Sequence, residues 1–193
     1  MNRSDAIEKA IAKLTPYFAD RLSRNRTVCE LHAHGEGFSE QHPPHAVVFA
    51  ETTQDVSFAL KICNDLGVPV VAFGAGTSLE GQINAVSGGI SIDLSRMNKV
   101  LEVNAGDMDC RVQAGVTRQE LNVYLRDEGL FFPVDPGGAA TIGGMCATRA
   151  SGQGAVRYAT VRDTVLGSHL VPADGLVLRP RRRVRKIDDR QSR

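Results

Sequence analysis

The sequence lacks several features that would point to common classes of protein. Tryptophan is absent, and aromatic residues make up only 5% of the chain. Single-stranded nucleic-acid sites usually stack bases on aromatic side chains, so we expect no nucleic-acid partner. The cysteines form no CxxC pair, being widely spaced at Cys29, Cys63, Cys110 and Cys146. We therefore expect neither a zinc site nor a disulfide framework, and predict buried free thiols in a reducing compartment.

Long apolar runs are also missing. None approaches the ~20 residues that a membrane-spanning helix needs. The N-terminus carries acidic residues and lacks the apolar centre of a signal peptide. We expect a cytoplasmic protein, or one at the periphery of the inner membrane. The net charge of +1 conceals a basic tail at 181–193, which we predict to be disordered because its clustered cations repel one another.

What remains is the composition of a globular domain. With 193 residues, 42% hydrophobic and 23% charged, the chain is long enough to form a substantial core. Apolar residues at helical spacing predict a helix over 4–14 with Ser4 as its N-cap. Residues 25–45 show no clear period, and we expect an extended segment there.

From Ala46 onward strands and helices are easier to place. The predicted elements are a strand at 46–50, a helix from Thr52 or Thr53 to Gly67, a buried strand at 69–73 and a strand at 89–94. A hairpin follows at 99–103 and 110–114, then a helix capped by Thr117 that buries Leu121, Tyr124 and Leu125 and stops at Gly129, and a second hairpin around Ala173-Asp174-Gly175. This order lacks regular βαβ alternation and predicts an α+β domain.

The first candidate site is the glycine-rich loop that follows the strand at 69–73. Glycines in Gly74-Ala75-Gly76-Thr77-Ser78 allow backbone N–H groups to surround an anion, and the two hydroxyls add donors. A phosphate or pyrophosphate is the natural ligand. A Rossmann site is the alternative, but Leu79 stands where its third glycine would be. A purely structural turn is a further alternative.

The second candidate is residues 135–158, which are rich in glycine, small residues and hydroxyls. Such a stretch cannot fill a core with its own side chains, but it can bring main chain close to a large flat ligand. Tight helix packing or a flexible loop are the alternatives. Two such segments in one small domain favour a shared cofactor that bears phosphate.

The other polar candidates are weaker. The histidines at 32, 34, 42 and 45 match no compact zinc pattern, so we interpret them as part of a surface segment. Asp163 could cap a helix or contact a cofactor. We assign no metal site.

Three stretches together resemble a known family. PVVAFGAGTSLEG, VDPGGAATIGGMCATRASG and AVRYATVRDTVLG are similar to the FAD-linked oxidases of the vanillyl-alcohol oxidase and p-cresol methylhydroxylase superfamily. Within it they most resemble D-lactate dehydrogenases of the cytochrome type and glycolate oxidase flavin subunits. The resemblance runs from about residue 30 to residue 180, and it implies an FAD-binding PCMH-type domain of two small subdomains over 45–180. Residues 1–44 would form an N-terminal helix and an extended segment.

The resemblance also implies which residues bind the cofactor. Gly74, Ala75, Gly76, Thr77 and Ser78 would hold the FAD pyrophosphate, and the rest of the flavin would be lined by Pro136, Thr141, Gly143, Gly144, Ala147, Ser151, Gly152 and Tyr158. Relatives that tether FAD covalently often use a histidine in the first loop. None lies there, so noncovalent FAD is expected. This chain departs from the family pattern at Arg149, Gln153 and Ala159, where the family commonly has Asn, Thr and Gly.

The largest departure is at the end of the chain, which stops where such relatives continue into a substrate domain. We therefore expect a truncated product, a gene fragment or one piece of a split enzyme, and we assign no catalytic residue. The resemblance implies oxidation of a small D-2-hydroxy acid, with electrons passing to a quinone or cytochrome partner. A non-catalytic FAD-binding fragment and another FAD-linked alcohol oxidase are the alternatives.

Overall fold

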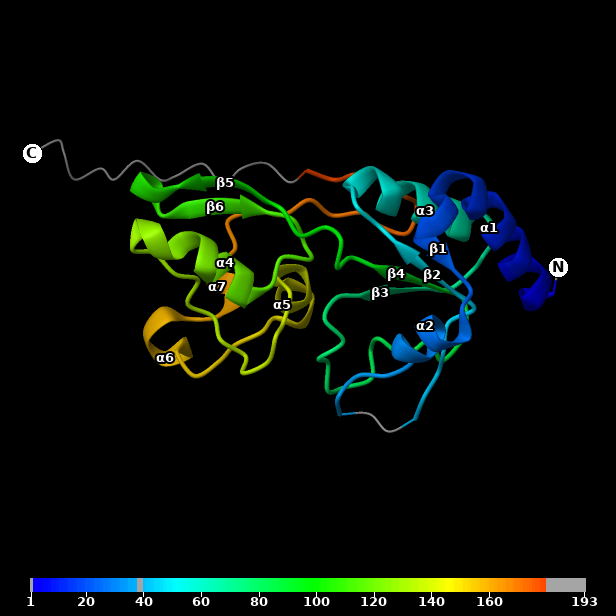
Figure 1. Cartoon of the computed structure of the whole chain (residues 1–193), viewed down its shortest axis with the longest axis horizontal. Coiled ribbons are helices and arrows are strands. Elements are labelled where there is room, and N and C mark those ends of the chain that lie inside the picture. The colour runs from blue at the N-terminus through cyan, green and yellow to red at the C-terminus, as the bar shows by residue number, and fades with distance from the viewer. Residues whose placement is uncertain (1, 38–39, 180–193) are drawn as a thin grey trace, which may run out of the picture.

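The computed structural model describes residues 2–37 and 40–179. The chain forms two lobes that lie side by side (Figure 1). The first lobe holds a four-stranded sheet with α1, α2 and α3, and the second holds a two-stranded sheet with α4 to α7. The basic tail predicted at 181–193 lies outside the described residues.

The first lobe is built around a mostly parallel sheet. Its elements are α1 (Arg3–Phe18), a short 3-10 helix (Ala19–Arg21), β1 (Leu22–Ser23), α2 (Arg26–Leu31), β2 (Ala46–Phe49), α3 (Thr53–Asp65), β3 (Val70–Phe73) and β4 (Ile90–Asp93). The strand order is β1-β2-β4-β3, in which β2, β4 and β3 run parallel and β1 runs antiparallel to β2. The carboxyl ends of the three parallel strands therefore meet at one edge.

Helices α1 and α3 cover one face of this sheet, and α2 lies on the other (Figure 1). Ile7, Leu14 and Phe18 of α1 are buried against Val48 and Ile90 in the main core. Thr52 begins α3 with a capping box, in which its hydroxyl accepts from the Asp55 amide and the Asp55 carboxylate accepts from the Thr52 amide. Such a cap contributes on the order of 1 kcal/mol.

The second lobe is smaller and has two apolar clusters. Its elements are β5 (Val100–Asn104), a 3-10 turn (Ala105–Asp107), β6 (Asp109–Val112), α4 (Arg118–Leu125), a 3-10 turn (Arg126–Glu128), α5 (Ile142–Thr148), α6 (Ala155–Tyr158) and α7 (Val161–Thr164). The β5–β6 hairpin and the Thr117 cap of α4 confirm the sequence prediction. The segment after α7 returns to the first lobe, where the Ser57 hydroxyl donates to the Gly175 carbonyl.

Several local predictions were wrong in the first lobe. Residues 26–31 form a helix rather than an extended segment, because the Asn25 side chain accepts from the amides of Thr27 and Val28 and begins it. The first helix starts after Asn2 rather than after Ser4. It continues through Pro16 to Phe18. Phe18 is fully buried, and its packing outweighs the helix hydrogen bond that proline cannot donate.

Other errors concern exposure and pairing. The strand predicted as buried at 69–73 is an edge strand with Ala72 exposed, because β4 lies between it and β2. Tyr124 is 59% exposed rather than packed inward, and Cys110 is also exposed. The second predicted hairpin is reduced to one bridge, between Leu170 and Leu178. The α+β class itself is confirmed. Within the described ranges, no helix is long and apolar enough to cross a membrane.

Candidate cofactor site

The loop after β3 presents a run of unused backbone donors. Among the described residues, the amides of 74–80 donate to no acceptor. Gly76 has a φ of +73°, a conformation that L side chains rarely adopt. The hydroxyl oxygen of Ser78 is buried and has no hydrogen-bond partner in the described part of the chain. Successive free N–H groups in a turn form a concave site of positive potential, which suits an anion.

The surroundings of this loop distinguish it from a Rossmann site. The loop lies at the carboxyl ends of the parallel strands, where open sheets of this kind commonly bind ligands. No helix occurs between Gly74 and β4, so the loop does not open a helix as a dinucleotide fingerprint would. The Rossmann alternative is therefore wrong, and the donors here come from the loop backbone.

The fold brings the two glycine-rich segments together. A Cβ built on Gly74 would lie 2.6 Å from the Thr141 hydroxyl oxygen, and one on Gly138 would lie 3.8 Å from Thr77 Cβ. The contact therefore joins the end of β3 to the start of α5, across the boundary between the lobes (Figure 1). A ligand on the first loop would also face residues of the second segment.

Some glycines of the second segment are needed for packing. The Gly144 amide donates to the Thr141 hydroxyl at 3.1 Å, and the Gly143 amide donates to the Ala114 carbonyl at 2.8 Å. A Cβ on Gly143 would lie 2.7 Å from Ala114 Cβ. Because its early amides are already used, the start of α5 is a structural junction, and the free donors belong to the first loop.

The remaining predicted residues are spread over the second lobe. Pro136, Ala147 and Ser151 are exposed, and Gly152 is packed against the Asp135 carbonyl, where a side chain would not fit. Tyr158 stacks edge-on against Phe131 with ring centroids 5.5 Å apart. Its helix α6 lies away from the loop after β3 (Figure 1), so the structure does not bring Tyr158 to the first loop.

Asp163, which could have capped a helix or met a cofactor, caps α7. Its carboxylate accepts from the amide and hydroxyl of Thr160 at 3.2 and 2.9 Å. The pKa of Asp163 is lowered mainly by the hydrogen bond from the Thr160 hydroxyl, and next by the one from the Thr160 amide.

One buried polar pair was missed by sequence reasoning. His32 is buried rather than part of a surface segment. Its Nε2 lies 2.9 Å from Asp93 Oδ2, and its Nδ1 lies 2.8 Å from the Val28 carbonyl oxygen. Asp93 ends β4, so the pair links α2 to the carboxyl edge of the sheet. No local signal could reveal a contact between residues so far apart in sequence.

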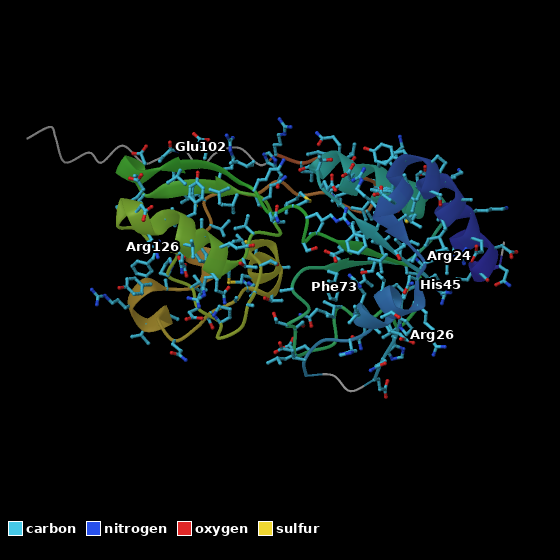
Figure 2. The ribbon with its side chains drawn as sticks, in the orientation of Figure 1. Arg24, Arg26, His45, Phe73, Glu102 and Arg126 are labelled. Atoms are coloured by element: carbon cyan, nitrogen blue, oxygen red, sulfur yellow. The ribbon has the colours of Figure 1, made fainter. Side chains whose placement is uncertain are left out.

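The pair is surrounded by aromatic rings and hydrogen bonds. The ring centroid of His32 lies 4.2 Å from that of Phe73, the last residue of β3 before the glycine loop. Phe73 is labelled in Figure 2, at the end of its strand nearer the second lobe. Burial raises the pKa of Asp93, but hydrogen bonds from His32 and Ser95 outweigh it, so the pKa is lowered and the group is a carboxylate.

The loop therefore fits a phosphate-bearing cofactor. It combines free amides, an unpaired buried hydroxyl at Ser78 and glycine at Gly74 and Gly76, where side chains would meet neighbouring atoms. No cluster of three potential metal ligands occurs among the residues that the structure describes.

Comparison with known proteins identifies that cofactor. Residues 44–180 match the family described as the FAD-binding domain, and the chain belongs to this family. FAD is therefore the cofactor for which the domain is built.

Two relatives of this chain are named as D-lactate dehydrogenases. The chain is 42% identical over 177 residues to a probable mitochondrial D-lactate dehydrogenase of Danio rerio, covering 91% of this chain and 36% of the relative. It is 42% identical over 183 residues to a mitochondrial D-lactate dehydrogenase [cytochrome] of Arabidopsis thaliana, covering 93% of this chain and 32% of the relative. The chain thus spans about a third of the length of these relatives.

Solved structures support the same fold. An alkyldihydroxyacetonephosphate synthase superposes with a TM-score of 0.82 at 26% identity, over 90% of this chain and 34% of that one. A substrate-bound p-cresol methylhydroxylase superposes with a TM-score of 0.72 at 22% identity, over 91% and 35%. The second likeness shows the fold alone, and it agrees with the predicted PCMH-type FAD-binding domain.

Proposed function

We propose that this chain is the FAD-binding part of a dehydrogenase that oxidises a small D-2-hydroxy acid, D-lactate first among them, to the 2-oxo acid. The observation that carries the proposal is the 42% identity to named D-lactate dehydrogenases, which extends over more than nine tenths of the chain. Glycolate is a second candidate substrate. A quinone or cytochrome as electron acceptor, and contact with a membrane surface, are further parts of the proposal.

The role of this chain in such an enzyme is to hold the cofactor in place. The amides of 74–80 would donate to the pyrophosphate, and the Ser78 hydroxyl would gain a partner that no described residue provides. Charge-assisted hydrogen bonds of this kind are about twice as strong as neutral ones. Bound FAD would supply the hydride acceptor, while the chain supplies position and electrostatic environment. Thr141 lies where the glycine loop meets the second glycine-rich segment.

The mode of attachment is tested by acid precipitation of FAD-loaded protein. No histidine lies in residues 74–80, so we propose noncovalent binding and expect all yellow colour in the supernatant. Colour that stays with the precipitate would contradict this mode.

The substrate is tested with a chimera in which residues 1–179 replace the matching part of the Danio rerio relative. We expect D-lactate to bleach the flavin absorbance anaerobically and L-lactate to leave it unchanged. The unmodified relative is the positive control, and FAD content is measured first. A chimera that holds FAD but is not bleached by D-lactate or glycolate would contradict the proposed substrate class.

The cellular location stays a prediction. Two eukaryotic relatives are named as mitochondrial proteins, whereas a cytoplasmic or membrane-peripheral location is proposed for this chain. Fractionation of cells that express the native gene would decide between soluble and membrane-associated pools.

A further inference from the structure

The buried His32–Asp93 pair lies directly behind the glycine loop. Nδ1 of His32 faces a backbone carbonyl, which can only accept, so this nitrogen carries a proton. Nε2 of His32 lies 2.9 Å from Asp93 Oδ2. Asp93 Oδ1 also accepts from the Ser95 amide at 2.6 Å. With both nitrogens of His32 and both oxygens of Asp93 engaged, the pair holds α2 rigidly to β4.

Two lines of contact run from this region to the loop. The first passes through Phe73, whose ring packs on His32 and would lie 2.9 Å from a Cβ on Gly76. The second follows the chain after α2, where Gly35 packs against the Ser78 carbonyl so closely that a Cβ would not fit. The loop is therefore supported on both sides by groups that His32 positions.

We propose that His32 and Asp93 are positioning residues for FAD, which hold Phe73 and Gly35 so that the amides of the glycine loop face the pyrophosphate. This inference rests on FAD binding at that loop. His32 and Asp93 bind each other, so neither offers a free charge to the ligand. The effect of the pair is on the order of the loop. The loop amides have no acceptor among the described residues, so the loop needs support from neighbouring side chains to keep its shape.

The test compares substitutions that keep or break the pair. In Asp93→Asn the amide can donate to Nε2 of a neutral imidazole, so the bridge survives without charge. In Asp93→Ala it is lost. We expect FAD affinity within threefold of the parent for Asp93→Asn, and at least tenfold weaker for Asp93→Ala, both measured by titration where each variant is folded. Phe73→Leu, which keeps an apolar side chain but removes the ring, should weaken binding at least threefold.

A matched control separates positioning from general stability. Asp55 is also buried and pairs with Arg21 at 2.6 Å. Its other partners are Tyr17 of α1 and the residues just before α3, so they lie away from the glycine loop in the chain. Asp55→Ala should lower the thermal midpoint and leave the FAD affinity of the folded protein unchanged. An equal loss of affinity in Asp55→Ala and Asp93→Ala would overturn the proposal, as would parental affinity in both Asp93→Ala and Phe73→Leu.

A ligand-free measurement separates this inference from the proposed function. Backbone order parameters of Gly74 and Gly76 from NMR relaxation should fall in Asp93→Ala and stay at the parental value in Asp93→Asn. If the parent binds no FAD, the proposed function fails while these order parameters still decide whether the pair orders the loop. Unchanged values in Asp93→Ala would overturn the positioning role.

Discussion

A side chain at Gly76 should displace the glycine loop and weaken FAD binding, and Gly67 offers a matched control. Both glycines have positive φ, +73° and +65°, so a valine is strained at either position by roughly 1–2 kcal/mol or more. A Cβ on Gly76 would lie 2.9 Å from Phe73 Cζ, whereas no atom of the described residues lies within 4 Å of one on Gly67. Both Gly76→Val and Gly67→Val should therefore lose stability, but only the first should displace the loop.

The expected loss of FAD affinity follows from the free amides. A hydrogen bond to a charged group contributes about 1.5–3 kcal/mol, so misaligning one amide weakens binding roughly tenfold to a hundredfold. Flavin fluorescence titration at 25 °C on folded protein measures the difference between Gly76→Val and Gly67→Val. Equal affinities in the two variants would refute the reasoning and leave the loop as an ordinary turn.

Three further predictions concern stability and reactivity. Asp55→Ala should lower the free energy of unfolding by about 3 kcal/mol. Burial raises the pKa of Asp55, but its hydrogen bonds outweigh burial, so the pKa is lowered. The stability that Asp55 contributes is therefore present above about pH 4 and is lost as the pH falls further. If Asp55→Ala lowered the urea midpoint equally at pH 7 and pH 2, this prediction would be contradicted. Ala159→Gly should stabilise by about 1 kcal/mol in thermal melts, because φ 63° and ψ −159° are essentially restricted to glycine. Ala12→Gly, at an exposed position within α1, should instead destabilise in the same comparison. Burial raises the pKa of Cys63 to about 11, so a thiol reagent at pH 8 should label exposed Cys110 first, and similar rates would show that the core opens readily.

The departure at Ala159 illustrates how sequence and structure combine. The family pattern commonly has glycine there, and the sequence alone shows only that alanine replaces it. The structure gives the physical cost, because Ala159 occupies a positive-φ conformation at the end of α6. Arg149 likewise has a φ of 54°, at the end of α5. Both departures therefore act through backbone conformation.

Local signals in the sequence determined most of the elements. The Thr52 and Thr117 caps work through residues three positions along the chain, so their hydroxyl and carboxylate partners are visible in the sequence. The β5–β6 hairpin and the glycine loop are also local, since turn chemistry and backbone freedom act over a few residues. The family motifs then predicted FAD as the cofactor, and the family match confirms it.

Only the tertiary structure decided how distant segments meet. The insertion of β4 between β2 and β3 exposes Ala72 at an edge, although its strand is as apolar as a central one. His32 and Asp93 are 61 positions apart, and each alone looks like an ordinary polar residue. Gly74 meets Thr141 across the two lobes. Such contacts depend on the packing of whole elements, which hydrophobic periodicity and turn signals do not encode.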